Sequence, residues 1–213
     1  MYELHYFPGN ASFAPHVVLR ELGLPFTLKL VDRENNAHKG AQYLKLNPTG
    51  RIPVLVEDGQ ALFETVAICM HLAERAPEAG LVPGLDAPER AKFLQWLVFM
   101  TNTVQPDILM YYYSDRYTTD PQGGRAIKEA AARRLEEWFA ILEDGLGAGP
   151  YFLGERYTLL DIYLTMLARW GRYLEKPPKA LPKTGAVARR VLARPAVGEV
   201  LAAEGIKGDF LSP

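Results

Sequence analysis

The chain has 213 residues, of which 48% are hydrophobic, and its 24 basic and 25 acidic residues leave a net charge of −1. This composition predicts a packed core rather than disorder, and the near-neutral charge argues against nucleic acid or an anionic membrane as the main partner. The single cysteine, Cys69, excludes an intramolecular disulfide and a thiolate metal cluster. We see no secretory signal and no apolar run near the ~20 residues that span a bilayer, so we expect a cytoplasmic protein.

The first part of the chain alternates strands and helices. Residues 2–7 alternate in polarity and are rich in aromatic side chains, which predicts a strand. After a Pro-Gly-Asn turn, Ser12 is expected to cap a helix that stops at Gly23. A second strand over 26–31, a polar loop and a short helix over 41–46 follow.

The next stretch, Asn47–Leu55, has two prolines and a glycine before a short apolar run, so the chain is expected to turn and then enter a strand. The Ile52–Pro53 bond is a place where a cis peptide is cheap, about 0.5–1 kcal/mol above trans. A cis bond would direct the amide and carbonyl of Ile52 away from the sheet, where they can pair with an extended peptide ligand. An ordinary hairpin explains the same residues equally well.

A hairpin turn at residues 57–60 and a strand at 61–63 lead into an apolar helix over 66–76. Glu64 and Thr65 lie at the start of this helix, where backbone amides can hold a carboxylate. The order of elements is therefore β-α-β-α-β-β-α over the first 76 residues. With right-handed crossovers, this order predicts a small mixed sheet covered by helices.

The rest of the chain is expected to be all-helical. Pro106 is expected to kink its first long helix. The Gly-rich segment 145–150 lacks the lysine of a phosphate-binding loop. Thr158 and Asp161 have the spacing of a capping box in front of an apolar, buried helix over 162–174. We expect a domain at 1–77, a linker rich in proline and glycine at 78–87, and a helical domain at 88–213.

Taken together, these motifs resemble the glutathione transferase superfamily over nearly the whole chain. The matching segments are residues 6–21, Asn47–Leu55, Glu64–Thr65 and the box at 158–161. The first segment is most similar to the bacterial beta class. The resemblance implies a thioredoxin-like N-terminal domain, an all-helical C-terminal domain and a homodimer that uses glutathione as co-substrate and holds no metal.

The resemblance also implies roles for particular residues in binding glutathione. Ile52 would pair through its backbone with the cysteinyl part, and Pro53 would be cis. The γ-glutamyl amine and carboxylate would be held by Glu64 and Thr65. The glycyl carboxylate would face His38 or Lys39.

The chain departs from the beta class at two positions. The cysteine of that class aligns with Ala11, and a histidine of its first long helix aligns with Gln105. A mixed disulfide with glutathione at that site is therefore impossible. Thiol-reductase chemistry is also disfavoured, because Cys69 lies inside an apolar helix and is expected to be buried packing.

Activation of glutathione then requires another group near the sulfur. A thiol of pKa ~8.5 is only a few per cent ionised at neutral pH. A hydroxyl donor together with a helix N-terminus favours the thiolate. Ser12 is the leading candidate for this donor, Tyr6 the second and Asn10 the third. Each also has an ordinary structural role, as helix cap, strand residue and turn residue respectively.

The electrophile pocket is expected between the domains, a usual place for small-molecule sites. Core packing explains each aromatic residue equally well. The candidate wall residues are Phe7, Phe13, Tyr111, Tyr112, Tyr113 and Trp170.

Three functions fit these observations. The first is a glutathione transferase whose bound thiolate attacks a hydrophobic electrophile. The second is a glutathione-binding or stress-adaptor protein with little turnover. The third is a glutathione-dependent isomerase or dehalogenase. The fold alone does not choose among them.

Overall fold

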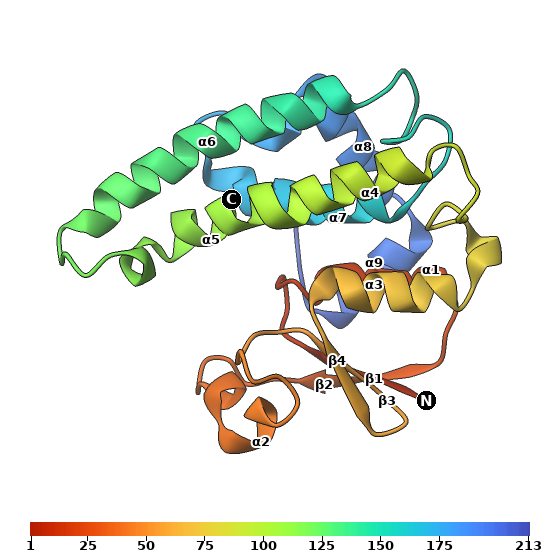
Figure 1. The fold of residues 1–213 in the computed structure, drawn as a ribbon, viewed down its shortest axis with the longest axis horizontal. Coiled ribbons are helices and arrows are strands. Elements are labelled where there is room, and N and C mark those ends of the chain that lie inside the picture. The colour runs from red at the N-terminus through yellow and green to blue at the C-terminus, as the bar shows by residue number, and fades with distance from the viewer. The chain divides into compact units, whose positions relative to one another are not determined.

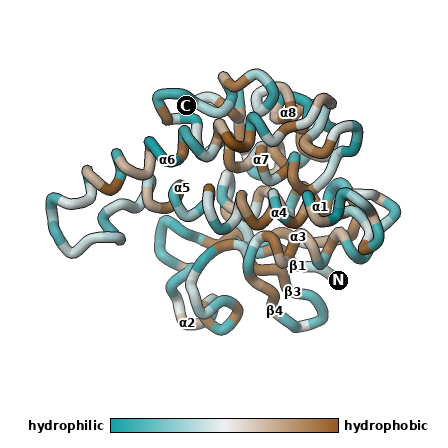
Figure 2. Tube along the Cα trace, turned by 45° about the horizontal axis from the view of Figure 1, so that its top comes forward, coloured by the Kyte–Doolittle hydropathy of each residue, from teal (hydrophilic) through white to brown (hydrophobic).

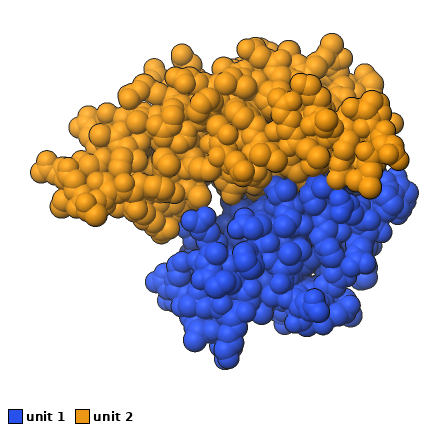
Figure 3. Space-filling view, viewed as in Figure 1, with its two compact units in different colours: residues 1–82, 192–208 blue, residues 83–191, 209–213 orange.

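The structure is a computed structural model that describes residues 1–213. It divides into two compact units (Figure 3). Unit 1 comprises residues 1–82 and 192–208, and unit 2 comprises residues 83–191 and 209–213. The segment 192–208 lies in the expected helical domain by sequence position, yet it packs within unit 1. The domain bounds given above stay a prediction. None of the helices is both long and apolar enough to cross a membrane.

Unit 1 contains one four-stranded sheet in the order β2-β1-β3-β4 (Figure 1). Its strands are β1 (Tyr2–Tyr6), β2 (Phe26–Leu30), β3 (Val54–Glu57) and β4 (Gln60–Phe63). Strand β2 runs parallel to β1, and β3 is antiparallel to both β1 and β4. The predicted mixed sheet is therefore confirmed.

The helices of unit 1 cover this sheet. They are α1 (Phe13–Glu21), α2 (Ala41–Leu44), α3 (Thr65–Glu74) and α9 (Pro195–Ala203), with short 3-10 turns η1 (Ala37–Lys39) and η2 (Pro77–Ala79). Helix α1 packs against both α3 and α9 (Figure 1). Val54 of β3 packs with Tyr43 of α2. Leu55, the next residue, is buried and pairs with Leu4 on the opposite face of the sheet, because side chains alternate along a strand.

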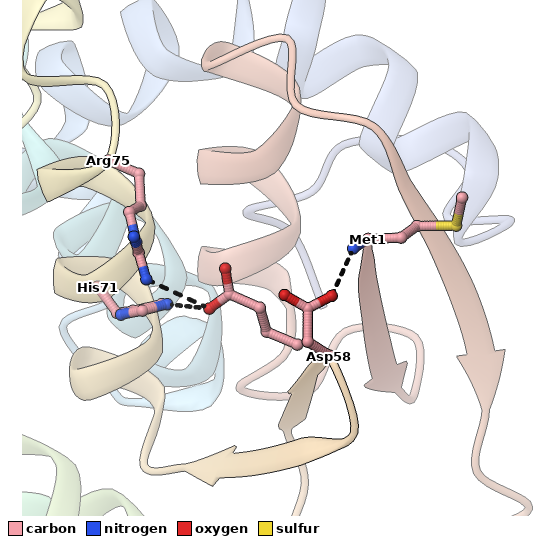
Figure 4. A network of polar contacts seen from close by, with 5 residues as sticks. Met1, Asp58, His71 and Arg75 are labelled. Atoms are coloured by element: carbon pink, nitrogen blue, oxygen red, sulfur yellow. Dashed lines mark hydrogen bonds and ion pairs between the residues drawn. The ribbon is translucent and has the colours of Figure 1, made fainter.

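The β3–β4 hairpin is joined to α3 by a polar network (Figure 4). His71 Nε2 lies 2.6 Å from Oε2 of Glu57, and Arg75 lies 3.8 Å from the same oxygen. The contact with His71 lowers the pKa of Glu57. At the hairpin tip, the terminal amine of Met1 lies 3.2 Å from Asp58. Such partly exposed pairs add little stability, but they orient the hairpin relative to α3.

The first long helix of unit 2 is interrupted by a π-helical turn just before Pro106. It consists of α4 (Arg90–Phe99), a π-helical turn η3 (Met100–Val104) and α5 (Gln105–Tyr112). Proline lacks an N–H, and its ring clashes with the carbonyl four residues earlier in an α-helix. A wider π turn immediately before Pro106 makes room for the ring. The helix is therefore irregular at the place where the sequence predicted a disturbance, and the kink itself stays a prediction.

The remaining elements of unit 2 are helices too. They are η4 (Ser114–Tyr117), α6 (Gly123–Gly145), α7 (Leu159–Trp170), η5 (Gly171–Tyr173), η6 (Pro178–Ala180) and α8 (Pro182–Leu192). In α7, residues 159–168 are all buried, and Figure 2 shows mostly hydrophobic residues along this helix. The prediction of a central, buried helix is confirmed.

The capping box at the start of α7 is also confirmed. The Thr158 N–H donates to Asp161 Oδ2 at 2.8 Å, and Thr158 Oγ1 accepts from the Leu160 N–H at 3.3 Å. Asp161 Oδ1 additionally accepts the Phe152 N–H at 2.7 Å. Burial raises the pKa of Asp161 to about 6, although these donors oppose the shift. The fully buried carboxylate therefore joins the residue 152 turn to the first turn of α7.

Candidate functional site

The turn before β3 is held by a buried asparagine. Asn47 is 2% exposed, and its Oδ1 accepts from both the N–H and the hydroxyl of Thr49. Its Nδ2 donates to the Arg51 carbonyl at 2.7 Å, which also accepts the Tyr43 hydroxyl at 2.9 Å. These bonds fix the chain immediately before Ile52. This role of the Asn47 side chain was not among the features predicted from the sequence.

The Ile52–Pro53 peptide bond is cis, as predicted. Strand β3 begins at Val54, so Ile52 lies outside the sheet ladder. Neither the N–H nor the C=O of Ile52 makes a hydrogen bond within the chain. A main-chain donor and acceptor are therefore available side by side at the end of the sheet, where an extended peptide can pair with them.

The start of α3 offers donors for an anion. Ile68 is the first residue of this helix whose amide reaches a carbonyl, that of Glu64 at 3.0 Å, so the amides before it are open to a ligand. The Thr65 hydroxyl makes no hydrogen bond within the chain, and the side chain of Glu64 is exposed. Glu64 has a φ of 74°, a region that costs a non-glycine residue energy and is concentrated at functional sites.

The turn η1, which carries His38 and Lys39, lies beside the loop that precedes Ile52. A Cβ on Gly50, whose φ is 60°, would come within 3.0 Å of the His38 carbonyl, so only glycine allows this close approach. The Lys39 ammonium donates to the Thr49 carbonyl at 3.3 Å and is otherwise exposed. Lys39 thus brings a positive charge near the loop before Ile52.

Ser12 does not make the helix cap that was predicted for it, and its role as a sulfur donor stays a prediction. It is 0% exposed and makes no side-chain cap to α1. Its hydroxyl donates to the Phe7 carbonyl at 3.0 Å and accepts the Phe7 N–H at 3.2 Å. These two bonds close the loop between β1 and α1, so a bond from the Ser12 hydroxyl to a bound sulfur would replace its bond to the Phe7 carbonyl.

The other two candidate donors keep free hydrogens. Tyr6 is half-buried at the end of β1, and its hydroxyl makes no hydrogen bond within the chain. Asn10 accepts the Ala11 N–H through Oδ1 at 2.6 Å, and its Nδ2 has no partner within the chain. Tyr6 precedes the loop that leads to the N-terminus of α1, and Asn10 lies within it. A helix N-terminus favours a thiolate.

The candidate pocket residues fall into two groups. In unit 1, Phe13 is fully buried, so it is a core residue rather than a wall that a ligand can reach. Phe7 is half-buried, with the Arg33 guanidinium 5.8 Å from its ring centre.

In unit 2, the structure brings Tyr112 and Trp170 together, because the Tyr112 hydroxyl donates to the Trp170 carbonyl at 2.7 Å. Burial raises the pKa of Tyr112. The Tyr111 hydroxyl donates to the Tyr173 carbonyl at 3.2 Å, and the Arg116 guanidinium lies 4.2 Å from the ring centre of Tyr113. The hydroxyls of Tyr111 and Tyr112 therefore hold η5 and the end of α7.

The structure shows what surrounds Cys69 and Gln105, the latter at the position of the beta-class histidine. Cys69 is completely buried, and burial raises the pKa of its thiol, so it is not a thiolate at neutral pH. Gln105 accepts a short hydrogen bond from the Tyr163 hydroxyl inside unit 2. No cluster of three or more potential metal ligands is present.

Sequence reasoning missed His16 and Glu204. Both are buried, and His16 Nδ1 lies 2.9 Å from Glu204 Oε1. A polar residue within the apolar stripe of a helix was the one available signal for His16. Nothing in the sequence indicates its partner, which lies 188 residues further along the chain.

The fold and this arrangement of groups agree with the family models that match the chain. Residues 12–75 match the model of the glutathione S-transferase N-terminal domain, and residues 101–195 match that of the glutathione S-transferase C-terminal domain. The chain therefore belongs to the glutathione S-transferase family.

Individual relatives show the same similarity. Glutathione S-transferase GstA of Escherichia coli O157:H7 is 30% identical over 96% of the chain and 100% of that protein. A glutathione transferase homologue from Sulfitobacter, solved with bound glutathione, is 28% identical with a TM-score of 0.88, over 97% of the chain and 99% of its own. The beta-class glutathione S-transferase of Sphingomonas chungbukensis is 30% identical with a TM-score of 0.81, over 96% of this chain and 100% of its own.

Proposed function

We propose that the protein is a glutathione transferase that binds glutathione and transfers its thiolate to a hydrophobic electrophile. The observation that carries this proposal is the unpaired main-chain N–H and C=O of Ile52, on a turn that Asn47 holds in place. Relatives that share the fold are glutathione S-transferases, and one was solved with bound glutathione.

The chain has groups for each part of glutathione. The main chain of Ile52 pairs with the cysteinyl residue as an added strand does. The γ-glutamyl carboxylate is held by the Thr65 hydroxyl and the open amides of α3, and the γ-glutamyl amine by the Glu64 carboxylate. Lys39, and His38 beside it, are suited to the glycyl carboxylate.

Tyr6 and Asn10 are the proposed donors to the glutathione sulfur. A decrease of about two units in the thiol pKa requires roughly 2.7 kcal/mol. One hydrogen bond to a charged group supplies about 1.5–3 kcal/mol. The sulfur lone pair then forms a bond to a carbon of the electrophile. In a substitution, the bond to the leaving group breaks and this group departs with the electron pair. In an addition, the π bond of the acceptor breaks, its electron pair moves onto the acceptor, and a proton from water completes the product. Among the proposed walls of the electrophile site, Phe7, Tyr111, Tyr112 and Trp170 have surface that a ligand can reach.

A calorimetric titration with glutathione, followed by turnover assays on a panel of electrophiles, tests this function. Binding with turnover is the expected result. Binding without turnover on any electrophile would favour the alternative of a glutathione-binding adaptor, and turnover confined to isomerisation or dehalogenation would favour the third function. An absence of glutathione binding would contradict the proposal.

Thr65→Val is expected to weaken glutathione binding. The substitution keeps the shape of the side chain but removes the hydroxyl proposed to bind the γ-glutamyl carboxylate, a loss of about tenfold or more in affinity. Titration calorimetry measures the effect, with Thr27→Val on the exposed edge strand β2 as the matched control. Equal affinities for the two variants would exclude Thr65 from the site.

We also propose that the protein is a homodimer, as the family resemblance implies. On α4, Leu94 and Val98 are 39% and 52% exposed. They lie four residues apart and so form one apolar patch on the helix surface. Val98→Glu is expected to shift the protein from dimer to monomer, and sedimentation velocity measures this shift. A monomeric wild-type protein would contradict the proposal.

The cytoplasmic location stays a prediction.

A further inference from the structure

A buried carboxylate of α9 contacts the loop between β1 and α1. Glu204 Oε2 accepts the Gly9 N–H at 2.9 Å, and Oε1 lies 2.9 Å from Nδ1 of His16. The side chains of Glu204 and His16 are both 0% exposed. Glu204 follows the last turn of α9, so the end of the chain supports a loop close to its beginning.

The same carboxylate acts on both proposed sulfur donors. Gly9 directly precedes Asn10, and the Gly9 φ of 66° shows a tight turn at this point. The His16 ring packs against the ring of Tyr6, with 6.2 Å between their centres. Through Gly9 and His16, Glu204 therefore restricts the positions of Asn10 and Tyr6.

Loss of this carboxylate would leave buried polar groups without partners. A carboxylate accepts only, so Nδ1 of His16 carries the hydrogen in this contact. Nε2 of His16 is already buried without a partner, and the Phe26 ring packs 5.5 Å from the imidazole. Without Glu204, both ring nitrogens of His16 would be unsatisfied and the Gly9 N–H would lose its carboxylate acceptor, so the loop would rearrange to reach water.

A second contact between α9 and α1 provides a matched comparison. Arg194, which precedes α9, donates two hydrogen bonds to the carboxylate of Glu21 at 2.6 and 2.8 Å. Glu21 is the last residue of α1, at the opposite end of this helix from the loop that contains Gly9. Glu21 and Glu204 therefore both join α9 to α1, but only Glu204 contacts the loop that carries a sulfur donor.

We propose that Glu204 is a positioning residue for the transfer reaction, acting through Gly9 and His16 on Asn10 and Tyr6. This inference rests on the proposed glutathione transferase function. The groups proposed to bind glutathione, Ile52, Glu64 and Thr65, lie on other segments. Disturbance of the Gly9 loop is therefore expected to change the chemical step rather than the affinity, and a shift of about 1 Å in such a group can cost on the order of 10² in rate.

The test compares Glu204→Met, Glu204→Gln and Glu21→Met. Methionine removes both hydrogen-bond acceptors at similar length, whereas the glutamine amide still accepts from Gly9 and donates to the other tautomer of His16. We expect kcat to decrease roughly 10- to 100-fold in Glu204→Met with an unchanged dissociation constant for glutathione. Glu204→Gln is expected to recover much of this loss, and Glu21→Met to keep the wild-type kcat. If Glu204→Met does not fold, Glu204→Asp takes its place, because the shorter carboxylate cannot reach both partners.

Amide hydrogen exchange of residues 7–12 gives a second readout that does not depend on activity. Faster exchange in Glu204→Met than in Glu21→Met supports the inference, even if the wild-type protein shows no turnover. A similar decrease in kcat in Glu204→Met and Glu21→Met, or unchanged exchange at residues 7–12, would overturn it. Failure of the proposed function is recognised separately, because the wild-type protein would then not bind glutathione.

Discussion

Replacement of Asp161 by alanine is expected to lower the free energy of unfolding by about 3–5 kcal/mol, the cost of breaking a buried network that involves a charged group. Asp161 is fully buried and accepts the amides of Phe152 and Thr158 at 2.7 and 2.8 Å. Alanine leaves both amides without an acceptor and so removes one half of the capping box of α7, the most buried helix of unit 2. A loss of this size is a large fraction of the stability of a typical domain.

Urea denaturation followed by circular dichroism measures this effect. If the variant does not accumulate, the yield of folded protein is compared with that of the wild type. Asp120→Ala is the matched control, because Asp120 accepts the Gln122 amide at 2.9 Å in an exposed turn before α6. We expect only a small change in that variant. Equal midpoints for the two variants would show that the buried carboxylate does not stabilise α7.

Tyr6→Phe is expected to lower kcat by about 10²-fold, the usual effect of removing one donor to a developing or resting anion in an active site. The ring remains packed against His16, so the fold is retained. Without the hydroxyl, the pKa of bound glutathione rises, and the thiolate fraction at neutral pH falls. The rate profile should therefore shift to higher pH, and activity should recover partly as the pH is raised.

Steady-state kinetics over a range of pH, together with thiolate absorbance of the glutathione complex, measure these changes. Tyr2→Phe on the same strand is the control, because the Tyr2 hydroxyl is directed to Glu57 and not to the Gly9 loop. A Tyr6→Phe variant with the wild-type profile would move the assignment to Asn10. Asn10→Ala should then show the shift instead.

Features that depend on nearby residues could be predicted from the sequence. The four strands, the hairpin at residues 57–60 and the capping box at Thr158 and Asp161 all follow from local turn, alternation and spacing rules, whereas the cis bond before Pro53 was implied by the family resemblance. In each case the interacting groups are separated by only a few residues, so the pattern itself contains the geometry.

Features that depend on the exact course of the chain could not be predicted. Ser12 has the right type and position for a cap, but the turn at residues 8–10 brings its hydroxyl to Phe7 first. The π turn before Pro106 is one of several ways to accommodate a proline. The contact between His16 and Glu204 requires the fold to be known, because no periodic pattern relates residues so distant in the chain.

The return of residues 192–208 to unit 1 has a consequence for how the protein is made. A ribosome releases the chain from its first residue onward, so the sheet emerges long before the helix that completes its unit. Until α9 is made, Nδ1 of His16 lacks the Glu204 carboxylate that it contacts in the folded protein. Residues 1–82 therefore cannot reach their final packing until α9 has been synthesised. A chimaeric protein that takes residues 1–82 from this chain must also include residues 192–208.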